Sequence, residues 1–419
     1  MTDAVPHGLS LAPFRALRPN ADSSRLATLL CPPYDVIGES ERARLLAADP
    51  DNAVALILPE PDGDTDRYAV AARHLERAVA QGLLAVDERA ALYVYEMRTA
   101  GGSTTRGLVG AVELRDPADG VILPHENTMA GPVSDRLSLM TATQANLEPI
   151  YLVYEGGGFA SQVVSEAASQ SPVAETVTSD GVAHRLWALT DEQVHREIAR
   201  DLSPRRALIA DGHHRYATYR EVQRRYGEER GPGPWDRGLT LLVDATAYGP
   251  QVHAIHRVLI GVPVDAAIRA ARDHLDVTLA PSIDDAMARI ETLPGFAMVI
   301  TDGAQIFVVH DPSESLAGRA GRAGEPNEVA ALDVTVLHRV LVEQVWKLAD
   351  TVDAVGYAHS IEEAVSAANA SGGSAVLLRP TPVAAVAAVA AAGGRMPRKS
   401  TLFTPKPASG LVMRRFIDC

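Results

Sequence analysis

Apolar positions at helical and alternating spacing divide the first part of the chain into helices and strands. Residues 66–81 carry apolar side chains three to four positions apart, and Gly82 follows as a C-terminal helix glycine, which predicts an amphipathic helix. A second predicted helix covers 40–48, and predicted strands cover 52–58, 91–97 and 108–114. This alternation predicts a mixed α+β lobe over residues 1–154.

The second part of the chain places a polar turn between a predicted strand and a predicted helix. The strand at 206–210 is short and apolar, the turn follows at 211–214, and a helix is predicted over 216–226. The other predicted elements of this lobe, residues 183–261, are strands at 184–189 and 239–244 and a helix at 191–202.

Residues 262–419 show a similar mixture and are predicted to form a separate C-terminal α/β domain. The apolar runs 296–301 and 305–310 flank Asp302-Gly303, which predicts a hairpin. The remaining predictions are helices at 263–274, 283–291, 335–348 and 383–392, a strand at 375–378 and an exposed loop at 313–325. The chain is therefore predicted to be α/β, with a mixed α+β core over residues 1–261.

Composition limits the classes of partner. The chain has 419 residues and a formal net charge of -14, so broad binding to nucleic-acid phosphates is not expected. Its two cysteines, Cys31 and Cys419, cannot form a disulfide framework or a cysteine zinc cage. The N-terminus lacks a signal-peptide pattern, and the apolar run 382–392 is too short to cross a bilayer. We expect a cytoplasmic protein without a nucleic-acid or membrane partner; the sequence indicates no oligomeric state.

The polar turn, Asp211-Gly212-His213-His214-Arg215, is the strongest candidate for chemistry. Glycine lets the backbone approach a ligand closely, and the start of a helix offers unpaired N–H groups to a phosphate. Arg215 adds a planar fork of donors, and the two histidines titrate near neutral pH. Asp211 can orient a histidine, act as a base or hold a metal ion. A capped turn with solvated histidines is the alternative.

A second polar stretch, His125-Glu126-Asn127-Thr128, combines a base, an acid, an amide and a hydroxyl in a predicted loop. Glu126 can act as general base toward a hydroxyl or water, with assistance from His125. Arg136, a little further along the chain, can bind an anion. The alternative is a surface loop in which Asn127 and Thr128 bond to their own backbone.

Two further stretches carry weaker signals. His253 and His256 are three residues apart, but no carboxylate completes a metal-ligand spacing, which favours structural histidines. The most basic stretch, residues 395–401 followed by Lys406, can bind an anion through Lys399 and Ser400 or form a solvated loop. It lacks the glycine spacing of a P-loop, and the chain has neither a dinucleotide-binding glycine motif nor a serine nucleophile elbow.

Five separated stretches together resemble a bacterial and archaeal family known as domain of unknown function 1015. They occur in the family's order over nearly the whole chain: CPPYDVI at 31–37, YVYE at 93–96, LPHENT at 123–128, DGHHRY at 211–216 and MPRKST at 396–401. The turn at 211–215 is also similar to the phosphate-handling turn of the ParB and sulfiredoxin-like superfamily. That superfamily includes nucleotide-binding partition proteins, sulfiredoxins and kinases acting on free serine.

The resemblance implies a ParB/sulfiredoxin-like core that holds the phosphates of a nucleotide or a phosphorylated metabolite at Gly212, His213, His214 and Arg215. It also implies an acidic residue opposite them as base, for which Glu126 is the candidate. Sulfinic-acid repair is not expected, because the turn has no cysteine. DNA partition does not fit an acidic chain without a helix-turn-helix pattern.

The leading hypothesis is phosphotransfer on a small hydroxylated metabolite, with free serine or phosphoserine the choice that the resemblance implies. ADP or ATP would serve in the kinase direction, with Mg²⁺ at Asp211. The proline-stiffened loop with Tyr34 and Asp35 would close over the substrate. The expected catalytic residues are Glu126, His125, His213, His214 and Asp211, and the expected phosphate-binding residues are Gly212, Arg215, Arg136, Asn127, Lys399 and Ser400.

Two other classes of function stay open. A regulatory module would bind a nucleotide at the same turn and report it to a partner through residues 262–419, without turnover. A metal-dependent hydrolase would use His125, His213, His214 and His256 as ligands.

Overall fold

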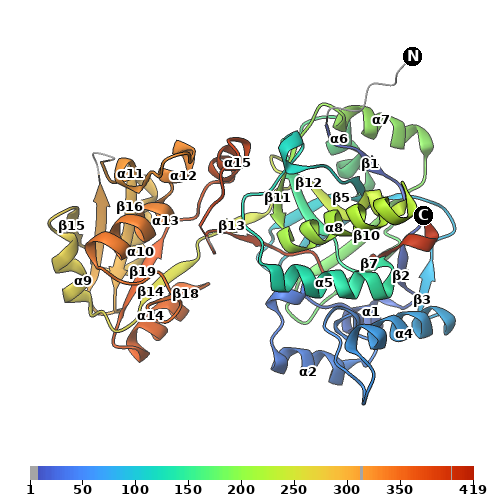
Figure 1. The fold of residues 1–419 in the computed structure, drawn as a ribbon, viewed down its shortest axis with the longest axis horizontal. Coiled ribbons are helices and arrows are strands. Elements are labelled where there is room, and N and C mark those ends of the chain that lie inside the picture. The colour runs from blue at the N-terminus through green and yellow to red at the C-terminus, as the bar shows by residue number, and fades with distance from the viewer. Residues whose placement is uncertain (1–7, 312–314, 398) are drawn as a thin grey trace. The chain divides into compact units, whose positions relative to one another are not determined.

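The computed structural model describes residues 8–311, 315–397 and 399–419, which form two compact units (Figure 1). Unit 1 contains the described residues up to 124, residues 128–250 and residues 405–419. Unit 2 contains 125–127 and the described residues of 251–404. The boundary between the units differs from the predicted boundary at residue 262. Residues 251–261 belong to unit 2, and residues 405–419 belong to unit 1.

A mixed sheet forms the centre of unit 1. Its strands are β1 (Leu11–Ala12), β4 (Leu92–Arg98), β5 (Thr104–Glu113), β6 (Ile122–Leu123), β8 (Ile150–Tyr154), β9 (Ala174–Val177), β10 (Ala183–Leu189), β11 (Ala207–Asp211) and β12 (Arg237–Asp244). Their order is β6-β11-β8-β12-β5-β4-β10-β9, with β1 on β5. Strand β11 runs antiparallel to β8 and parallel to β6, so the polar turn leaves the sheet from an interior strand.

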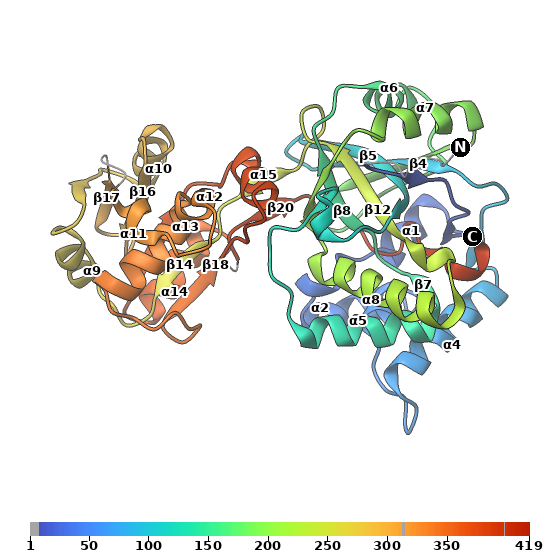
Figure 2. The same ribbon diagram turned by 45° about the horizontal axis from the view of Figure 1, so that its top comes forward.

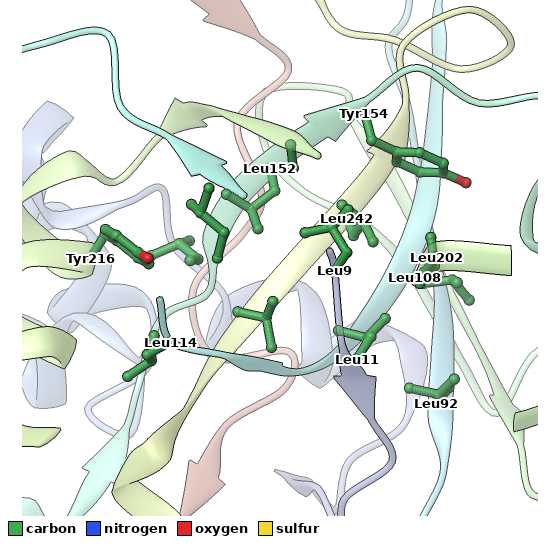
Figure 3. Packing of buried hydrophobic residues seen from close by; sticks show 14 of the residues in the cluster. Leu9, Leu11, Leu92, Leu108, Leu114, Leu152, Tyr154, Leu202, Tyr216 and Leu242 are labelled. Atoms are coloured by element: carbon green, nitrogen blue, oxygen red, sulfur yellow. The ribbon is translucent and has the colours of Figure 1, made fainter. Parts of the chain in front are cut away.

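Helices cover both faces of this sheet (Figures 1 and 2). Helices α6 (Phe159–Ala167) and α7 (Glu192–Leu202) pack together on one face, and α5 (Ala130–Thr143) and α8 (His213–Arg230) pack together on the other. Leu108 and Leu242 face each other on neighbouring strands and share one buried core with Leu9 and Leu202 (Figure 3). Burying each such side chain contributes roughly 1.5–3 kcal/mol, which fixes the sheet against its helices.

The N-terminal segment adds a smaller helical layer that packs on α5. It contains β2 (Leu17–Pro19), α1 (Ser23–Leu29), a 3₁₀ turn (Tyr34–Val36), α2 (Glu39–Ala48), α3 (Val54–Ile57), α4 (Arg67–Ala80) and β3 (Leu84–Val86). Leu56, Leu75 and Leu139 share its core. The C-terminal residues join this layer, because Leu17 pairs with Met413 and β21 (Arg414–Arg415) pairs with β7 (Ala145–Asn146). Short 3₁₀ turns lie at Pro117–Asp119, Pro234–Asp236 and Phe416–Asp418.

Unit 2 is built on an antiparallel sheet with the order β15-β17-β16-β19-β14-β18. These strands are β14 (His256–Leu259), β15 (Asp276–Leu279), β16 (Phe296–Thr301), β17 (Ile306–Asp311), β18 (Val355–Ala358) and β19 (Ser374–Leu378). A separate pair joins β13 (Gln251–His253) to β20 (Leu402–Thr404). The helices are α9 (Val264–Ala271), α10 (Ile283–Thr292), α11 (Ser315–Ala320), α12 (Asn327–Ala330), α13 (Asp333–Val336), a π-helix (Leu337–Val345), α14 (Ile361–Ala370) and α15 (Val383–Ala391).

The mixed α/β class predicted from the sequence is confirmed. The predicted helix at 66–81 is α4, followed by Gly82 at φ +72°. The predicted hairpin around Asp302-Gly303 is the antiparallel pair β16–β17. The predicted strand, turn and helix over 206–226 are β11 and α8.

The predicted strand at 52–58 is wrong, because this segment contains helix α3. The side chain of Asn52, which is fully buried, accepts a hydrogen bond from the backbone N–H of Val54 at 2.9 Å. Its amide nitrogen donates to the carbonyls of Thr28 and Leu30 at 2.7 and 2.9 Å. These bonds fix a helical turn at the start of an apolar run that reads as a strand by residue type alone.

Two other predictions need correction. The predicted exposed loop at 313–325 contains α11, whose Leu316 and Ala320 are buried; residues 313–314 lie outside the described residues. The predicted single helix at 335–348 is α13 followed by the π-helix, and it ends at Val345. Arg136, which is predicted to bind an anion, lies within helix α5.

Within residues 8–311, 315–397 and 399–419, no helix combines the length and apolar character that crossing a membrane requires. The prediction that the N-terminus lacks a signal-peptide pattern rests in part on residues 1–7, which lie outside these ranges.

Candidate functional site

The turn between β11 and α8 is close-packed and has a backbone conformation that favours glycine. Gly212 stands at φ +92°, in the left-handed region, and is the N-cap of α8 without a side-chain cap. A Cβ atom at this position would lie 3.1 Å from Nε of Arg215. The side chain of Arg215 therefore folds back beneath the turn, and the first N–H groups of α8 have no acceptor within the helix.

Asp211 is held between two cations. One carboxylate oxygen pairs with the guanidinium of Arg215, and the other accepts a hydrogen bond from Nζ of Lys406 at 2.6 Å. Arg215 also donates to the carbonyl of Pro149 at 2.5 Å and is only 3% exposed. Arg215 thus fixes the turn through its bonds to Asp211 and Pro149, and Lys406 binds Asp211 from another segment.

Lys406 connects the turn to the proline-stiffened loop. Its ammonium lies 3.5 Å from Oδ2 of Asp35, next to its shorter bond to Asp211. The side chain of Asp35 is 42% exposed, whereas those of Lys406 and Asp211 are 17% and 11% exposed. Three segments that are far apart in the sequence therefore meet in one charged cluster within unit 1: residues 31–36, 211–215 and 405–409.

The charges of this cluster shift its pKa values. Burial raises the pKa of Asp35, but Lys406 and Arg215 lower it more, so it lies below the ordinary value of 3.8. Burial lowers the pKa of Lys406, but Asp211 and Asp35 raise it above its ordinary value of 10.5. Asp35 is therefore ionised and Lys406 charged at neutral pH.

The two histidines of the turn differ in surroundings. Nε2 of His214 accepts a hydrogen bond from the backbone N–H of Met129 at 3.1 Å, which requires the neutral ring. Burial lowers the pKa of His214; Asp35 opposes this shift and Arg215 reinforces it. His213 is buried at 7% exposure. His214 is thus a neutral group at the rim of the charged cluster.

Tyr34 and Arg136, predicted to bind substrate and phosphate, contact each other next to the cluster. The guanidinium of Arg136 covers the ring of Tyr34 at 4.2 Å, and its nitrogens bond to Asp135 and to the carbonyl of Ile57. Arg136 is 5% exposed. Burial raises the pKa of Tyr34 to about 12, so its hydroxyl stays protonated.

The other predicted site residues belong to unit 2, where two of the sequence stretches meet. The carbonyl of His125 accepts from the backbone N–H of Met396 at 2.7 Å, and its Nε2 lies 3.3 Å from Oγ1 of Thr401. Lys399 is exposed at φ +53°, and its carbonyl accepts from the buried Arg257 at 3.0 Å. Arg398 of this stretch lies outside the described residues.

Within unit 2, Ser400 is buried and its hydroxyl donates to the carbonyl of Pro397 at 2.5 Å. Glu126 is partly buried and Asn127 is exposed. These residues belong to a different unit from the turn at 211–215. The action of Glu126 as base on a phosphate at that turn stays a prediction.

Sequence reasoning missed the roles of two residues. Lys406 was noted only as part of a basic stretch, although the whole chain has just two other lysines, Lys347 and Lys399. Glu148 is 4% exposed and is the single charged residue in the run 145–154. A lone carboxylate in an apolar run indicates a residue with a specific role, because burying it requires specific partners.

The residues do not fit a protein-bound Mg²⁺ ion. Both oxygens of Asp211 contact cations, and Lys406 stands between the two carboxylates of the cluster. Across the part of the chain that the structure describes, no three His, Cys, Asp or Glu side chains group as metal ligands. The four histidines of the hydrolase hypothesis are divided between the units: His213 and His214 lie in unit 1, and His125 and His256 lie in unit 2.

Comparison with family models identifies the chain's relatives. The model of the family described as "Protein of unknown function (DUF1015)" matches residues 11–335, more than three quarters of the chain. The chain belongs to this family. The DUF1015 match includes the turn at 211–215 and the loop at 31–36, and it ends before Lys406. A comparison with curated proteins gives no match.

Some solved structures are similar to this DUF1015 chain at low identity. A free serine kinase in complex with AMP is 15% identical, with 68% of this chain and 83% of that chain covered and a TM-score of 0.34. A conserved hypothetical protein from Pyrococcus furiosus is 16% identical, with 68% and 88% covered and a TM-score of 0.33. SbnI from Staphylococcus aureus, truncated at its C-terminus, is 12% identical, with 73% and 86% covered and a TM-score of 0.36.

Proposed function

We propose that unit 1 carries out phosphotransfer on a small hydroxylated metabolite at the cluster formed by Asp35, Asp211, Lys406 and the start of α8. The observation that supports this most is the position of Lys406, which lies between two carboxylates beside the start of α8, where the N-cap residue Gly212 has no side chain. An ammonium and a helix N-terminus both attract phosphate, and an ionised carboxylate beside them can accept a proton.

In this proposal the phosphate binds against the first N–H groups of α8 and the ammonium of Lys406. The Lys406–Asp211 bond is short and partly buried, whereas the Lys406–Asp35 contact is longer and lies at the more exposed side. An entering phosphate oxygen therefore competes with Asp35 for the ammonium and leaves the bond to Asp211 intact. Arg215 is buried in its bonds to Asp211 and Pro149, so it supports the turn instead of touching the phosphate.

Asp35 is the proposed general base. In the kinase direction, its carboxylate takes the proton of the substrate hydroxyl while that oxygen forms a bond to phosphorus. The bond between phosphorus and the nucleotide's bridging oxygen breaks, and ADP or AMP leaves. In the phosphatase direction, the carboxylate takes a proton from water while the water oxygen forms a bond to the phosphorus of phosphoserine. The bond between phosphorus and the serine oxygen breaks, the serine oxygen takes up a proton, and serine and phosphate leave. Glu126 is the alternative base that the family resemblance implies.

Serine or phosphoserine is the proposed substrate, and ATP or ADP the proposed nucleotide. This choice follows the similarity of the sequence at 211–215 to the phosphate-handling turn of a superfamily that includes free-serine kinases. Neutral His214 at the rim of the cluster would donate its Nδ1–H to a phosphate oxygen or to the substrate.

The direct test is turnover with defined substrates. The protein is incubated with serine plus ATP, with serine plus ADP, and with phosphoserine alone, and phosphoserine and phosphate are measured. We expect turnover in one of these mixtures and a loss of roughly 100-fold or more in Asp35→Asn. Asp64→Asn, an exposed aspartate of the same unit, is the matched control and should turn over normally.

Each other outcome has a defined meaning. Normal turnover in Asp35→Asn with loss in Glu126→Gln would assign the base to unit 2. Binding of phosphoserine or nucleotide without turnover in any mixture would contradict the proposed enzymatic activity and favour a regulatory module.

A further inference from the structure

Resting on the proposed function, we propose that Glu148 is a positioning residue that holds the segments of Asp35 and Lys406 in register at the site. Glu148 follows β7 and precedes β8, so its backbone is anchored at the centre of unit 1. Its side chain reaches two segments of the cluster, the loop at 31–36 and the residues at 405–409.

One carboxylate oxygen joins both segments. Oε1 of Glu148 accepts from the backbone N–H of Tyr34 at 3.1 Å, directly before Asp35 in the chain. The same oxygen accepts from the hydroxyl of Ser409 at 3.0 Å, three residues after Lys406. The segments also pair through their backbones, because Cys31 and Ser409 exchange N–H to carbonyl bonds of 3.3 and 2.8 Å.

The backbone next to this side chain fixes the third segment. The carbonyl of Glu148 accepts from the hydroxyl of Tyr219 on α8 at 2.6 Å. The adjacent carbonyl of Pro149 accepts from Arg215, which in turn pairs with Asp211. One dipeptide therefore contacts all three segments that form the charged cluster.

The side chain of Glu148 is buried beside a cation. Glu148 is 4% exposed, and its Oε2 lies 3.7 Å from Nη1 of Arg136. Arg136, Arg215, Glu148 and Tyr219 line a cavity of about 20 Å³. This space holds about one water molecule and no substrate, so Glu148 acts through the segments it binds and not on the reacting atoms.

The test uses the reactivity of lysines. Because the chain has three lysines, acylation by acetic anhydride can be followed at each by mass spectrometry. Lys347 and Lys399 are exposed and serve as internal standards, whereas Lys406 is partly buried and bonded to Asp211. In the wild-type protein we expect acylation to be slowest at Lys406.

Glu148→Ala removes both hydrogen bonds, and Glu148→Gln keeps an oxygen that can accept them. We expect labelling of Lys406 to rise about tenfold in Glu148→Ala and less in Glu148→Gln, with the other two lysines unchanged. Glu96→Gln is the matched control, because Glu96 is also 4% exposed in unit 1 but pairs with Arg106 and Arg185. In the turnover assay, Glu148→Ala should lower kcat/KM by about 10- to 100-fold, with partial rescue by glutamine.

The outcomes separate the two proposals. Unchanged Lys406 labelling in folded Glu148→Ala would overturn the positioning role. If Glu148→Ala does not fold, Ser409→Ala removes one bond alone, and it must raise Lys406 labelling for the role to stand. Increased labelling in a protein that turns over none of the substrates would support the positioning role and overturn the proposed reaction.

Discussion

At the scale of single residues, the site is a set of charges that stabilise one another. Asp211 is shared by Arg215 and Lys406, and Lys406 is shared by Asp211 and Asp35. Breaking one buried pair leaves the other charge without compensation, which costs more than an exposed ion pair contributes. The charges that are proposed to bind a phosphate therefore also stabilise the folded site.

This coupling predicts how stability depends on pH. The folded pKa of Asp35 is lowered, so its contribution is present above its ordinary value of 3.8 and is lost as pH falls through the lower folded value. The folded pKa of Lys406 is raised, so its contribution is present below 10.5 and is lost as pH rises through the higher folded value.

The measurement is urea unfolding of the wild type and of Lys406→Met at about pH 7 and about pH 12. The wild type should be more stable than the variant at neutral pH, and the difference should shrink at high pH. A difference that stays constant over this interval would show that the charge of Lys406 does not stabilise the fold.

At the scale of elements, the long periodic segments were predictable and the short ones were not. Helix α4 follows its apolar spacing from the cap at Asp66 to the glycine at 82, so local pattern and tertiary structure agree. Helix α3 has apolar, partly β-branched residues in a single turn, and the long-range bonds of Asn52 decide its conformation. A sequence pattern cannot show such bonds.

Replacing Asn52 by alanine therefore tests an element that the pattern misassigned. The variant loses two long-range bonds and the bond to the N–H of Val54, and it removes a donor from the partly buried carbonyl of Thr28 and from the buried carbonyl of Leu30. We expect the free energy of unfolding to fall by about 2–4 kcal/mol. A loss below about 0.5 kcal/mol in denaturant unfolding would contradict this account of α3.

The candidate site shows the same limit. The turn at 211–215 was predictable because glycine, histidines and arginine stand together at a strand-to-helix junction. Lys406 lies far away in the sequence, and its place beside Asp211 follows from the backbone pairing of Ser409 with Cys31. The residue type of Arg215 predicts a phosphate ligand, and its bond to the carbonyl of Pro149 is the reason that we propose a supporting role for it instead.

At the scale of the whole molecule, the order of the chain explains why Lys406 completes the site. The chain leaves unit 1 at residue 250 and re-enters it at 405, so Lys406 is the second residue after its return. The site of unit 1 thus depends on residues from both ends of the sequence, Asp35 near the beginning and Lys406 near the end. A fragment that stops at residue 404 would lack the cation on which the proposed chemistry depends.

The most direct test of the central claim is the rate of phosphoserine formation or hydrolysis in Lys406→Met, measured beside Lys347→Met. Lys347 is exposed in unit 2 and controls for the loss of a lysine as such. We predict that Lys406→Met lowers kcat by roughly 100-fold or more, because the phosphate loses the partly buried cation that binds it, while Lys347→Met matches the wild type. Equal rates in all three proteins would contradict a phosphotransfer site at Lys406.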